Sequence, residues 1–297
     1  MKLKDILMKK ILGYLLFIIC VTIFMLYYQF PEDIAVQLVK SKAREIAPQL
    51  TIDLESIKPS FPPGIQVKGL TVDTPSMRLW DAALMTAQPE FMSIFHLKPS
   101  LFFYCKGYGG EIKGDFGITK LQSLWKQQPL PLSCDVKWRN IQINKIDALK
   151  NIPYALEGIL FGIFSYKGVT GAWIDGSGTL KLIIENGNIT LQKPILQAIK
   201  NIQFKRFDAD LSFENKVIQL LQSNIDGDIE GSLSGTITLH PIFQRSQINI
   251  TGKIKPSQDY INKSKLPIKA FIQPDKLKNG IPVTLTGTIL RPVFNTM

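Results

Sequence analysis

The sequence predicts a mainly β protein, in which an N-terminal transmembrane helix and a short amphipathic helix precede a long, curved antiparallel β-sheet with few further helices. Three observations lead to this prediction. Residues 11–28 contain no charged side chain. After Leu50 the chain changes to short alternating runs broken by Gly, Pro and Asn, which is typical of strands and turns. Near the C-terminal end a five-residue pattern recurs three times, which indicates a repeated strand unit.

The uncharged run from Ile11 to Tyr28 is long enough to be a membrane anchor. At about 1.5 Å per residue it spans roughly 27 Å as a helix, close to the hydrocarbon thickness of a bilayer, so we expect residues 11–30 to form the anchor. A cleaved signal peptide is the alternative, but the run exceeds the usual apolar region of such peptides and no small-residue cleavage motif follows it. The side chains expected inside the membrane include Ile11, Leu15, Phe17, Ile19, Phe24 and Tyr28.

The charges that flank this run predict its orientation. Four lysines precede it, whereas Glu32 and Asp33 follow it. Because basic residues beside a span stay on the cytoplasmic side, we expect residues 1–10 in the cytoplasm and the bulk of the chain outside it. No second apolar run approaches membrane length, so a single crossing is expected.

The composition argues against nucleic-acid binding. The net charge is +11, but the 35 basic residues are spread singly along the chain. Such dispersed charge suits a solvated basic surface, anionic lipid head groups or acidic partners. Cys20 lies in the uncharged run, whereas for Cys105 and Cys134 two alternatives stay open, a disulfide between them or two free buried thiols.

Residues 31–49 are expected to form a juxtamembrane helix. Pro31, Glu32 and Asp33 suit a first helical turn, and Pro48 suits its end. Apolar residues recur at helical spacing, which predicts a stripe that docks on the following domain. A helix that lies on the membrane surface is the alternative. The residues of the stripe are Ile34, Ala35, Leu38, Val39 and Ile46.

Residues 50–297 are expected to form one β-rich domain. A turn at residues 59–64 separates two extended runs, and residues 76–128 are expected to mix strands with short helices, one of them around residues 121–127. In the C-terminal half, strict alternation predicts half-buried antiparallel strands, none longer than roughly 35 Å at about 3.3 Å per residue. These alternating runs centre on residues 207–213, 229–239, 248–254 and 283–289.

The repeated pattern has an apolar residue at each end and a glycine at its centre. Its three copies, LSGTI, ITGKI and LTGTI, begin at Leu233, Ile250 and Leu285, and the intervals of 17 and 35 residues suggest one and two hairpin lengths. The glycine falls on the apolar face, where a missing side chain lets a sheet curve or another backbone approach. These repeat glycines are Gly235, Gly252 and Gly287.

Several stretches, taken in order, resemble the GspN-type inner-membrane component, protein N, of bacterial type II secretion systems, which itself resembles the larger AsmA-like envelope proteins. They are the N-terminal run followed by Phe30-Pro31, the PSFPPG turn at 59–64, GYGGEIKG at 107–114, and the segments 227–256 and 283–294. The resemblance implies a single-pass inner-membrane protein with a periplasmic β domain. It also implies an association with other type II secretion components, and it brings no catalytic residues.

The resemblance implies two functions. One is a non-enzymatic accessory or scaffold component of the secretion system. The alternative is a lipid-binding or lipid-transfer protein, because AsmA-like proteins are thought to hold phospholipid acyl chains along a curved sheet. An apolar sheet face must be covered by helices, by a second sheet or by a ligand, and an open groove for acyl chains predicts a rim of Lys and Arg. The oligomeric state stays open.

No catalytic, cofactor or metal site is predicted. His96 and His240 lack a recognisable catalytic partner, which argues against an enzyme. The acidic residues at 226, 228 and 230 do not match the spacing of a calcium loop, and the glycines at 107–110 suit a hairpin turn better than a phosphate loop. The tryptophans, which we assign to packing, are Trp80, Trp125, Trp138 and Trp173.

Overall fold

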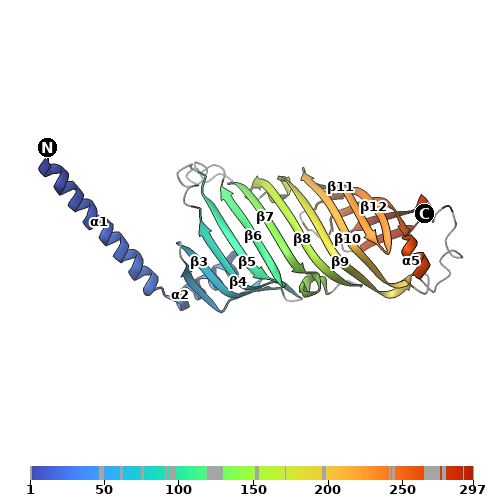
Figure 1. Cartoon of the computed structure of the whole chain (residues 1–297), viewed down its shortest axis with the longest axis horizontal. Helices are drawn as coiled ribbons and strands as arrows, with labels where there is room; N and C mark the ends of the chain where they lie inside the picture. The colour runs from blue at the N-terminus through green and yellow to red at the C-terminus, as the bar shows by residue number, and fades with distance from the viewer. Residues whose placement is uncertain are drawn as a thin grey trace.

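The chain forms one long antiparallel sheet preceded by two helices, α1 (Lys2–Tyr28) and α2 (Glu32–Ile46) (Figure 1). The computed structural model describes residues 2–46, 50–60, 63–74, 77–90, 93, 98–118, 130–150, 154–170, 172–195, 199–240, 242, 245–263, 275, 279–289 and 291–296. The strands are β1 (Thr51–Asp53), β2 (Ser56–Ser60), β3 (Gly64–Asp73), β4 (Arg78–Pro89), β5 (Ser100–Gly107), β6 (Gly110–Ile118), β7 (Pro131–Gln142), β8 (Tyr154–Val169), β9 (Ser177–Ile195), β10 (Ile199–Glu214), β11 (Val217–Gly227), β12 (Ile229–Thr238), β13 (Gln247–Pro256), β14 (Ile281–Thr288) and β15 (Arg291–Thr296).

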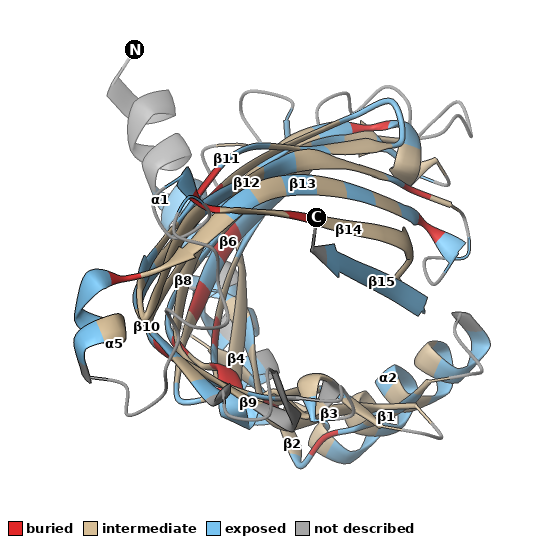
Figure 2. Ribbon diagram, turned by 90° about the vertical axis from the view of Figure 1, so that its right-hand side faces the viewer, coloured by how far each residue is buried: buried red, intermediate tan, exposed pale blue. Residues whose placement is uncertain are grey.

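From β3 onward each strand pairs antiparallel with the next strand along the chain, and β1 and β2 both pair with β3. Such a meander needs only local connections. Figure 2 shows that the sheet does not lie flat but curls into an open curve, with β1 to β3 at one end and β14 and β15 at the other. The predicted mainly β fold with a long, curved antiparallel sheet is therefore confirmed.

The two faces of the sheet differ in chemistry, as the alternation predicts. On β7, Cys134, Val136 and Trp138 are half-buried, whereas Asp135 and Lys137 between them are exposed. The register carries the same alternation to the neighbouring strands. One row on the polar face contains Thr86, Tyr104, Lys113, Lys137, Ile163, Lys181, Asp210 and Gln222.

The apolar face is the concave one. The short helix α5 (Gln258–Lys263) lies outside the curve in Figure 2. It lines a cavity together with Asp226 and Glu230, which belong to the polar face. The polar face is therefore the outer one. On the apolar face the rings of Tyr166 and Phe213 stack with centroids 6.1 Å apart, on either side of Gly178. Strands two apart in a flat sheet are roughly 9.5 Å apart, so these rings converge as side chains inside a curve do.

Helix α1 contains the predicted anchor and extends away from the sheet (Figure 1). Its predicted membrane-facing side chains Ile11, Leu15, Phe17, Phe24 and Tyr28 have exposed fractions of 55–79 %, and the side chain of Ile19 lies outside the described part. Among the residues described, no helix combines the length and the apolar character that crossing a membrane requires. The transmembrane role of residues 11–30 stays a prediction.

Helix α2 forms where predicted, but only part of the predicted apolar stripe is half-buried. Ile34 and Leu38 of the predicted stripe are 66 % and 59 % exposed, and the side chain of Ile46 is not among those described. The helix contacts β1 and β2, where Lys40 binds Asp53 at 2.5 Å and Glu32 binds Lys58 at 3.2 Å. The half-buried residues of the helix are Glu32, Ala35, Val36, Lys40 and Ala43.

Two expectations about the strands can be compared with the structure. The described part of residues 77–118 consists mainly of strands, with Ser93 helical, so the expected mixture of strands and short helices stays a prediction, and the helix expected around 121–127 lies outside the described residues. Strand β9 has 19 residues, which at about 3.3 Å per residue is roughly 63 Å, well beyond the expected limit. Positive φ at Asn186 and a shift in pairing between Glu157 and Ile159 mark irregularities that sequence alternation does not reveal.

The three repeat pentads lie side by side on β12, β13 and β14. Gly235 lies opposite Ile250, Gly252 opposite Leu233, and Gly287 opposite Ile248, so each glycine faces a large apolar residue of its neighbour. The interval of 35 residues does not mark two hairpins, because β13 pairs directly with β14 and α5 lies between them in the chain.

Candidate functional site

Two rows of apolar residues run across the concave face. They follow the register from β2 to β14 and from β2 to β15, so each covers roughly 60 Å at about 4.8 Å per strand. The first row is Ile57, Val67, Met85, Cys105, Ile112, Trp138, Gly162, Leu182, Ala209, Ser223, Leu233, Gly252 and Val283. The second row is Pro59, Ile65, Ala87, Phe103, Gly114, Val136, Phe164, Leu180, Leu211, Leu220, Gly235, Ile250, Leu285 and Phe294.

The only hydroxyl in these rows belongs to Ser223, and it forms two hydrogen bonds. Between β11 and β12 the ladder is interrupted after Leu220. There Ser223 Oγ accepts a hydrogen bond from the Leu233 N–H at 2.8 Å and donates one to the Leu233 carbonyl at 3.0 Å. Ser223, 2 % exposed, therefore replaces two missing backbone bonds without adding free polarity to the concave face.

Glycines in these rows make room for aromatic rings. The Trp138 ring covers Gly162 and the Phe103 ring covers Gly114, and a Cβ at either glycine would collide with that ring. Each ring can thus lie along the sheet instead of standing away from it. The repeat glycines Gly235 and Gly252 occupy the same rows.

The most buried part of the concave face is a cluster on β4 to β7 formed by Ala82, Cys105, Ile112 and Ile141. Trp80 and Trp138 pack against it, in agreement with the packing role predicted for them. Burial raises the pKa of the Cys105 thiol to about 11, and it also raises the pKa of Cys134. Both thiols are free, with Cys105 buried and Cys134 half-buried, so the structure does not contain a disulfide between these two cysteines.

No second layer covers these rows in the part of the chain that the structure describes. All strands belong to one sheet. Helix α2 contacts only its first strands, and the short 3₁₀ turns η1 (Ile143–Lys145), η2 (Asp147–Leu149) and η3 (Trp173–Asp175) contact β4 and β8. Second-row residues such as Phe164, Leu180 and Leu211 are only partly buried. Several residues of the first row are buried by their neighbours, among them Ile57, Cys105, Ile112, Ala209, Ser223 and Val283. The accessible apolar surface of the concave face therefore lies mainly along the second row.

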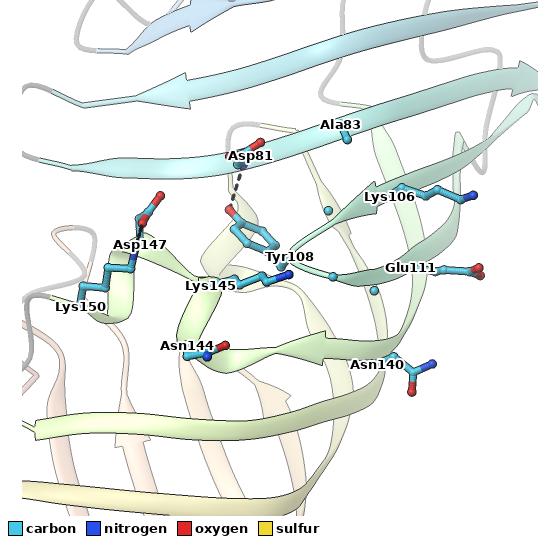
Figure 3. A pocket seen from close by; sticks show the side chains of 13 residues that line it. Asp81, Ala83, Lys106, Tyr108, Glu111, Asn140, Asn144, Lys145, Asp147 and Lys150 are labelled. Carbon is cyan, nitrogen blue, oxygen red and sulfur yellow. Dashed lines mark hydrogen bonds and ion pairs between the residues drawn. The ribbon is translucent and has the colours of Figure 1, made fainter.

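A polar cavity of about 730 Å³ lies at one long edge of the sheet, where β4 begins, β5 turns into β6 and β7 ends (Figure 3). Lys106 and Glu111, which line it, alternate with Cys105 and Ile112 and so belong to the polar face. The GYGG segment forms the hairpin turn that was predicted, with Tyr108 and Gly109 at φ values of 53° and 78°. The side chains of Lys106, Asn144 and Lys145 surround this turn. Lys106 lies on β5, whereas Asn144 and Lys145 lie on η1. No sequence pattern indicated that these two elements are neighbours.

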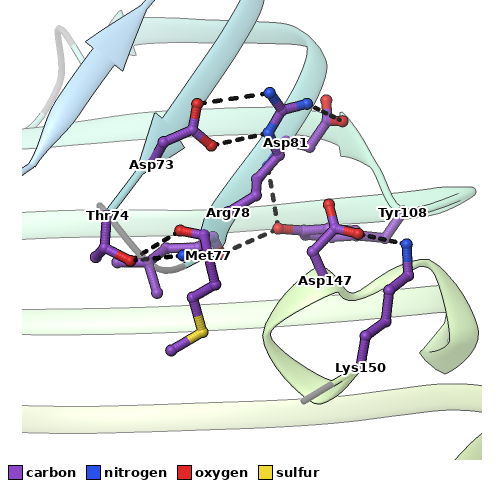
Figure 4. Close-up of polar contacts among 9 residues, drawn as sticks. Asp73, Thr74, Met77, Arg78, Asp81, Tyr108, Asp147 and Lys150 are labelled. Atoms are coloured by element: carbon purple, nitrogen blue, oxygen red, sulfur yellow. Dashed lines mark hydrogen bonds and ion pairs between the residues drawn. The ribbon is translucent and has the colours of Figure 1, made fainter.

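Hydrogen bonds and ion pairs hold this edge in place (Figure 4). The Tyr108 hydroxyl donates to the Leu79 carbonyl at 3.1 Å and accepts from the Asp81 N–H at 3.0 Å, and burial raises the pKa of this hydroxyl. Its ring packs edge-on against Trp80 with centroids 5.9 Å apart. Arg78 binds Asp73 at 2.9 Å on the neighbouring strand. The hairpin turn is thus fixed to β4 by one aromatic side chain.

Other residues singled out in the sequence lie elsewhere. His240 sits in a turn, where its Nδ1 accepts a hydrogen bond from the Ile242 N–H at 3.0 Å, whereas His96 lies outside the described residues. Asp228 accepts from the Gln203 N–H at 2.9 Å, and Glu230 binds Lys255 at 3.3 Å. The described residues contain no group of three or more His, Cys, Asp or Glu that suits a metal ion.

Comparison with protein-family models, with curated proteins and with solved structures finds no match for this chain. The concave apolar face, its polar edge and the resemblance described above are therefore the basis for the function proposed next.

Proposed function

We propose that this protein is a membrane-anchored, non-enzymatic lipid-binding protein of the cell envelope, which holds acyl chains along the concave face of its sheet. The observation that carries the proposal is the pair of continuous apolar rows with no covering layer in the described part of the chain. Of the two functions that the resemblance implies, this geometry favours the lipid-binding one.

The energetics of the concave face support a ligand. Burial of apolar surface contributes about 25 cal/mol for each Å² removed from water, so covering the partly accessible residues of the second row with acyl chains is favourable. A bilayer core is about 30 Å thick, which makes each leaflet about 15 Å. Rows of roughly 60 Å therefore have room for several acyl chains side by side.

Helix α1 supports the membrane location. Its apolar side chains are exposed on all sides rather than packed on the sheet, as residues such as Leu12, Leu16 and Phe24 illustrate. In a bilayer these apolar side chains would contact lipid tails instead of water, which removes the unfavourable free energy of their exposure. Its placement ahead of β1 would tether the lipid-binding sheet beside its source of lipid.

The proposal is tested with the full-length protein extracted from membranes in a mild detergent. Phospholipid that stays bound through size-exclusion chromatography is quantified by mass spectrometry, and an unrelated single-pass membrane protein prepared in parallel is the control. We expect several phospholipid molecules per chain above the control. Lipid at the level of the control would refute the proposal.

The secretion role has one specific observation in its favour, which is the free edge of strand β15. Val293 and Phe294 are 50 % and 55 % exposed there, and a terminal strand can pair with a strand of a partner protein. Capture of type II secretion subunits by a cross-linker placed on β15, together with secretion genes beside this one, would support that role. Recovery of the lipid without these subunits would oppose it.

A further inference from the structure

Helix α2 keeps apolar side chains on the side that faces away from the sheet. Ile34 and Leu38 are 66 % and 59 % exposed, and residues four apart lie one above the other on a helix. Ser41 and Glu45 continue the same side of the helix in its last two turns, and both are exposed. The outer side of α2 is therefore apolar at its beginning and polar at its end.

The opposite side of α2 is attached to the sheet. Val36 and Ala43 lie on the side of the helix opposite Ile34, and both are half-buried. Lys40 binds Asp53 of β1 at 2.5 Å, and a second ion pair joins the helix to β2 at 3.2 Å. These contacts with two strands fix the rotation of the helix about its axis. The outer side is thus available for a surface that does not belong to the sheet.

The chain places the beginning of α2 next to the end of the proposed membrane anchor. Only residues 29–31 separate the two helices, so their ends are at most about 15 Å apart. Tyr27 and Tyr28, at the end of α1, are 48 % and 79 % exposed. Tyrosine is enriched in membrane proteins where hydrocarbon meets water. With α1 in a bilayer, the apolar beginning of α2 lies near the membrane surface.

Helix α2 also lies at the end of the sheet where the apolar rows of the concave face begin (Figure 1). It contacts β2, and Ile57 and Pro59 of β2 are the first members of the two rows. Ile65 is the neighbour of Pro59 in the second row and is 48 % exposed. A membrane-bound α2 would hold this end of the rows beside a source of lipid.

We propose that helix α2 docks on the surface of the bilayer that contains α1, with Ile34 and Leu38 inserted among the lipid head groups. The inference rests on the membrane anchorage in the proposed function and adds to it the surface that orients the sheet. Insertion removes two apolar side chains from water, and the stabilisation grows with the area that is buried. Ser41 and Glu45 stay in water, so the helix is tilted with its beginning deeper in the membrane.

The test uses the full chain reconstituted in phospholipid vesicles, which are floated through a density gradient so that only anchored protein is measured. Benzoylphenylalanine, a photo-crosslinking amino acid that inserts into nearby C–H bonds, replaces Leu38 in one protein. In the control it replaces Ile163, which lies on the polar face of β8. Mass spectrometry of the labelled peptide identifies phospholipid adducts. The variant I34Q and its matched control I163Q, each of which removes an exposed isoleucine, are then combined with the probe at position 38.

We expect phospholipid adducts from the probe at position 38 and none from the probe at position 163. The substitution I34Q should lower the yield at position 38 about tenfold, and I163Q should leave it unchanged. Absence of phospholipid adducts at position 38, or a yield that I34Q does not lower, would overturn the inference. Adducts with another protein in place of lipid would overturn it in favour of a protein partner.

A second measurement, on the same proteins in detergent micelles, follows the proposed function independently. Phospholipid with brominated acyl chains quenches tryptophan fluorescence, and Trp80 and Trp138 pack at the cluster on the concave face. Quenching without phospholipid adducts at position 38 would overturn the docking of α2 alone. Adducts without quenching would overturn lipid binding by the sheet and leave the docking of α2 in place. A protein that does not float with the vesicles would overturn the anchorage on which both proposals rest.

Discussion

A charge placed on the concave face should abolish lipid binding, whereas the same charge on the other face should not. Phe164 and Ile163 are neighbours on β8 that point to opposite faces. Phe164 lies in the second apolar row, and Ile163 lies in the polar row with an exposed fraction of 45 %. The variants F164K and I163K thus introduce the same lysine at adjacent positions and differ only in the face that carries it.

The size of the effect follows from the area that acyl chains would cover. A phenylalanine side chain presents about 200 Å² of apolar surface, and Phe164 is only partly accessible. Covering roughly a quarter of that surface, about 50 Å², at about 25 cal/mol per Å² contributes about 1.2 kcal/mol, or roughly eightfold in affinity. The cost of desolvating the lysine adds to this value, so F164K should bind brominated phospholipid at least that much more weakly than I163K.

Loss of folding must be separated from loss of binding. Phe164 stacks on Tyr166 with centroids 6.1 Å apart, so the melting temperature of F164K is measured by circular dichroism. The pair F294K and V293K repeats the comparison on the terminal strand β15, where both residues are at least half-exposed and a lysine disturbs little packing. If F164K and I163K, both folded, bind lipid equally, the assignment of the concave face is wrong.

Three further predictions concern stability and reactivity. Replacing Ser223 with Ala leaves the Leu233 N–H and carbonyl without their partner, and the free energy of unfolding in urea should fall by about 2 kcal/mol. Burial, with Glu90 and Asp135 nearby, raises the pKa of Asp115. The folded state therefore binds the Asp115 proton more tightly, and D115N should raise the melting temperature at pH 7 by an amount that vanishes as the pH falls toward about 4. Because the pKa of Cys105 is about 11, its thiol should react with a maleimide at pH 7 only after unfolding.

Each of these predictions has an outcome that contradicts it. Unchanged urea stability of the Ser223 variant would mean that water replaces the lost hydroxyl. A D115N advantage that grows on acidification would mean that the carboxylate is stabilised rather than destabilised by folding. Rapid labelling of Cys105 in the native protein, detected by mass spectrometry of its peptide, would mean that the cluster around it opens easily.

The sequence predicted the parts of this fold that depend on neighbouring residues. Alternation over residues 207–213 and 248–254 predicts half-buried strands, because side chains one residue apart leave a strand on opposite faces. The GYGG segment predicts a tight hairpin for an equally local reason, since glycine accepts positive φ without a steric cost. Helix α2 was placed correctly by its flanking prolines and acidic residues, but its packed face was predicted only in part, because Ala35 of the expected stripe is half-buried whereas Ile34 and Leu38 are exposed.

Only the tertiary structure decided how these parts combine. Whether the apolar face is covered depends on long-range packing, and in the described part of the chain the strands form a single curved sheet. The register across β2 to β15, with its bulges, determines that Phe103, Leu180 and Leu285 share one row. Lys106 and Lys145 line the same edge cavity although they are far apart in the chain, and next to Lys145 the side chain of Ile143 is buried while Ile146 packs against the cluster. No local sequence pattern predicts this arrangement, because it depends on contacts between residues that are far apart in the chain.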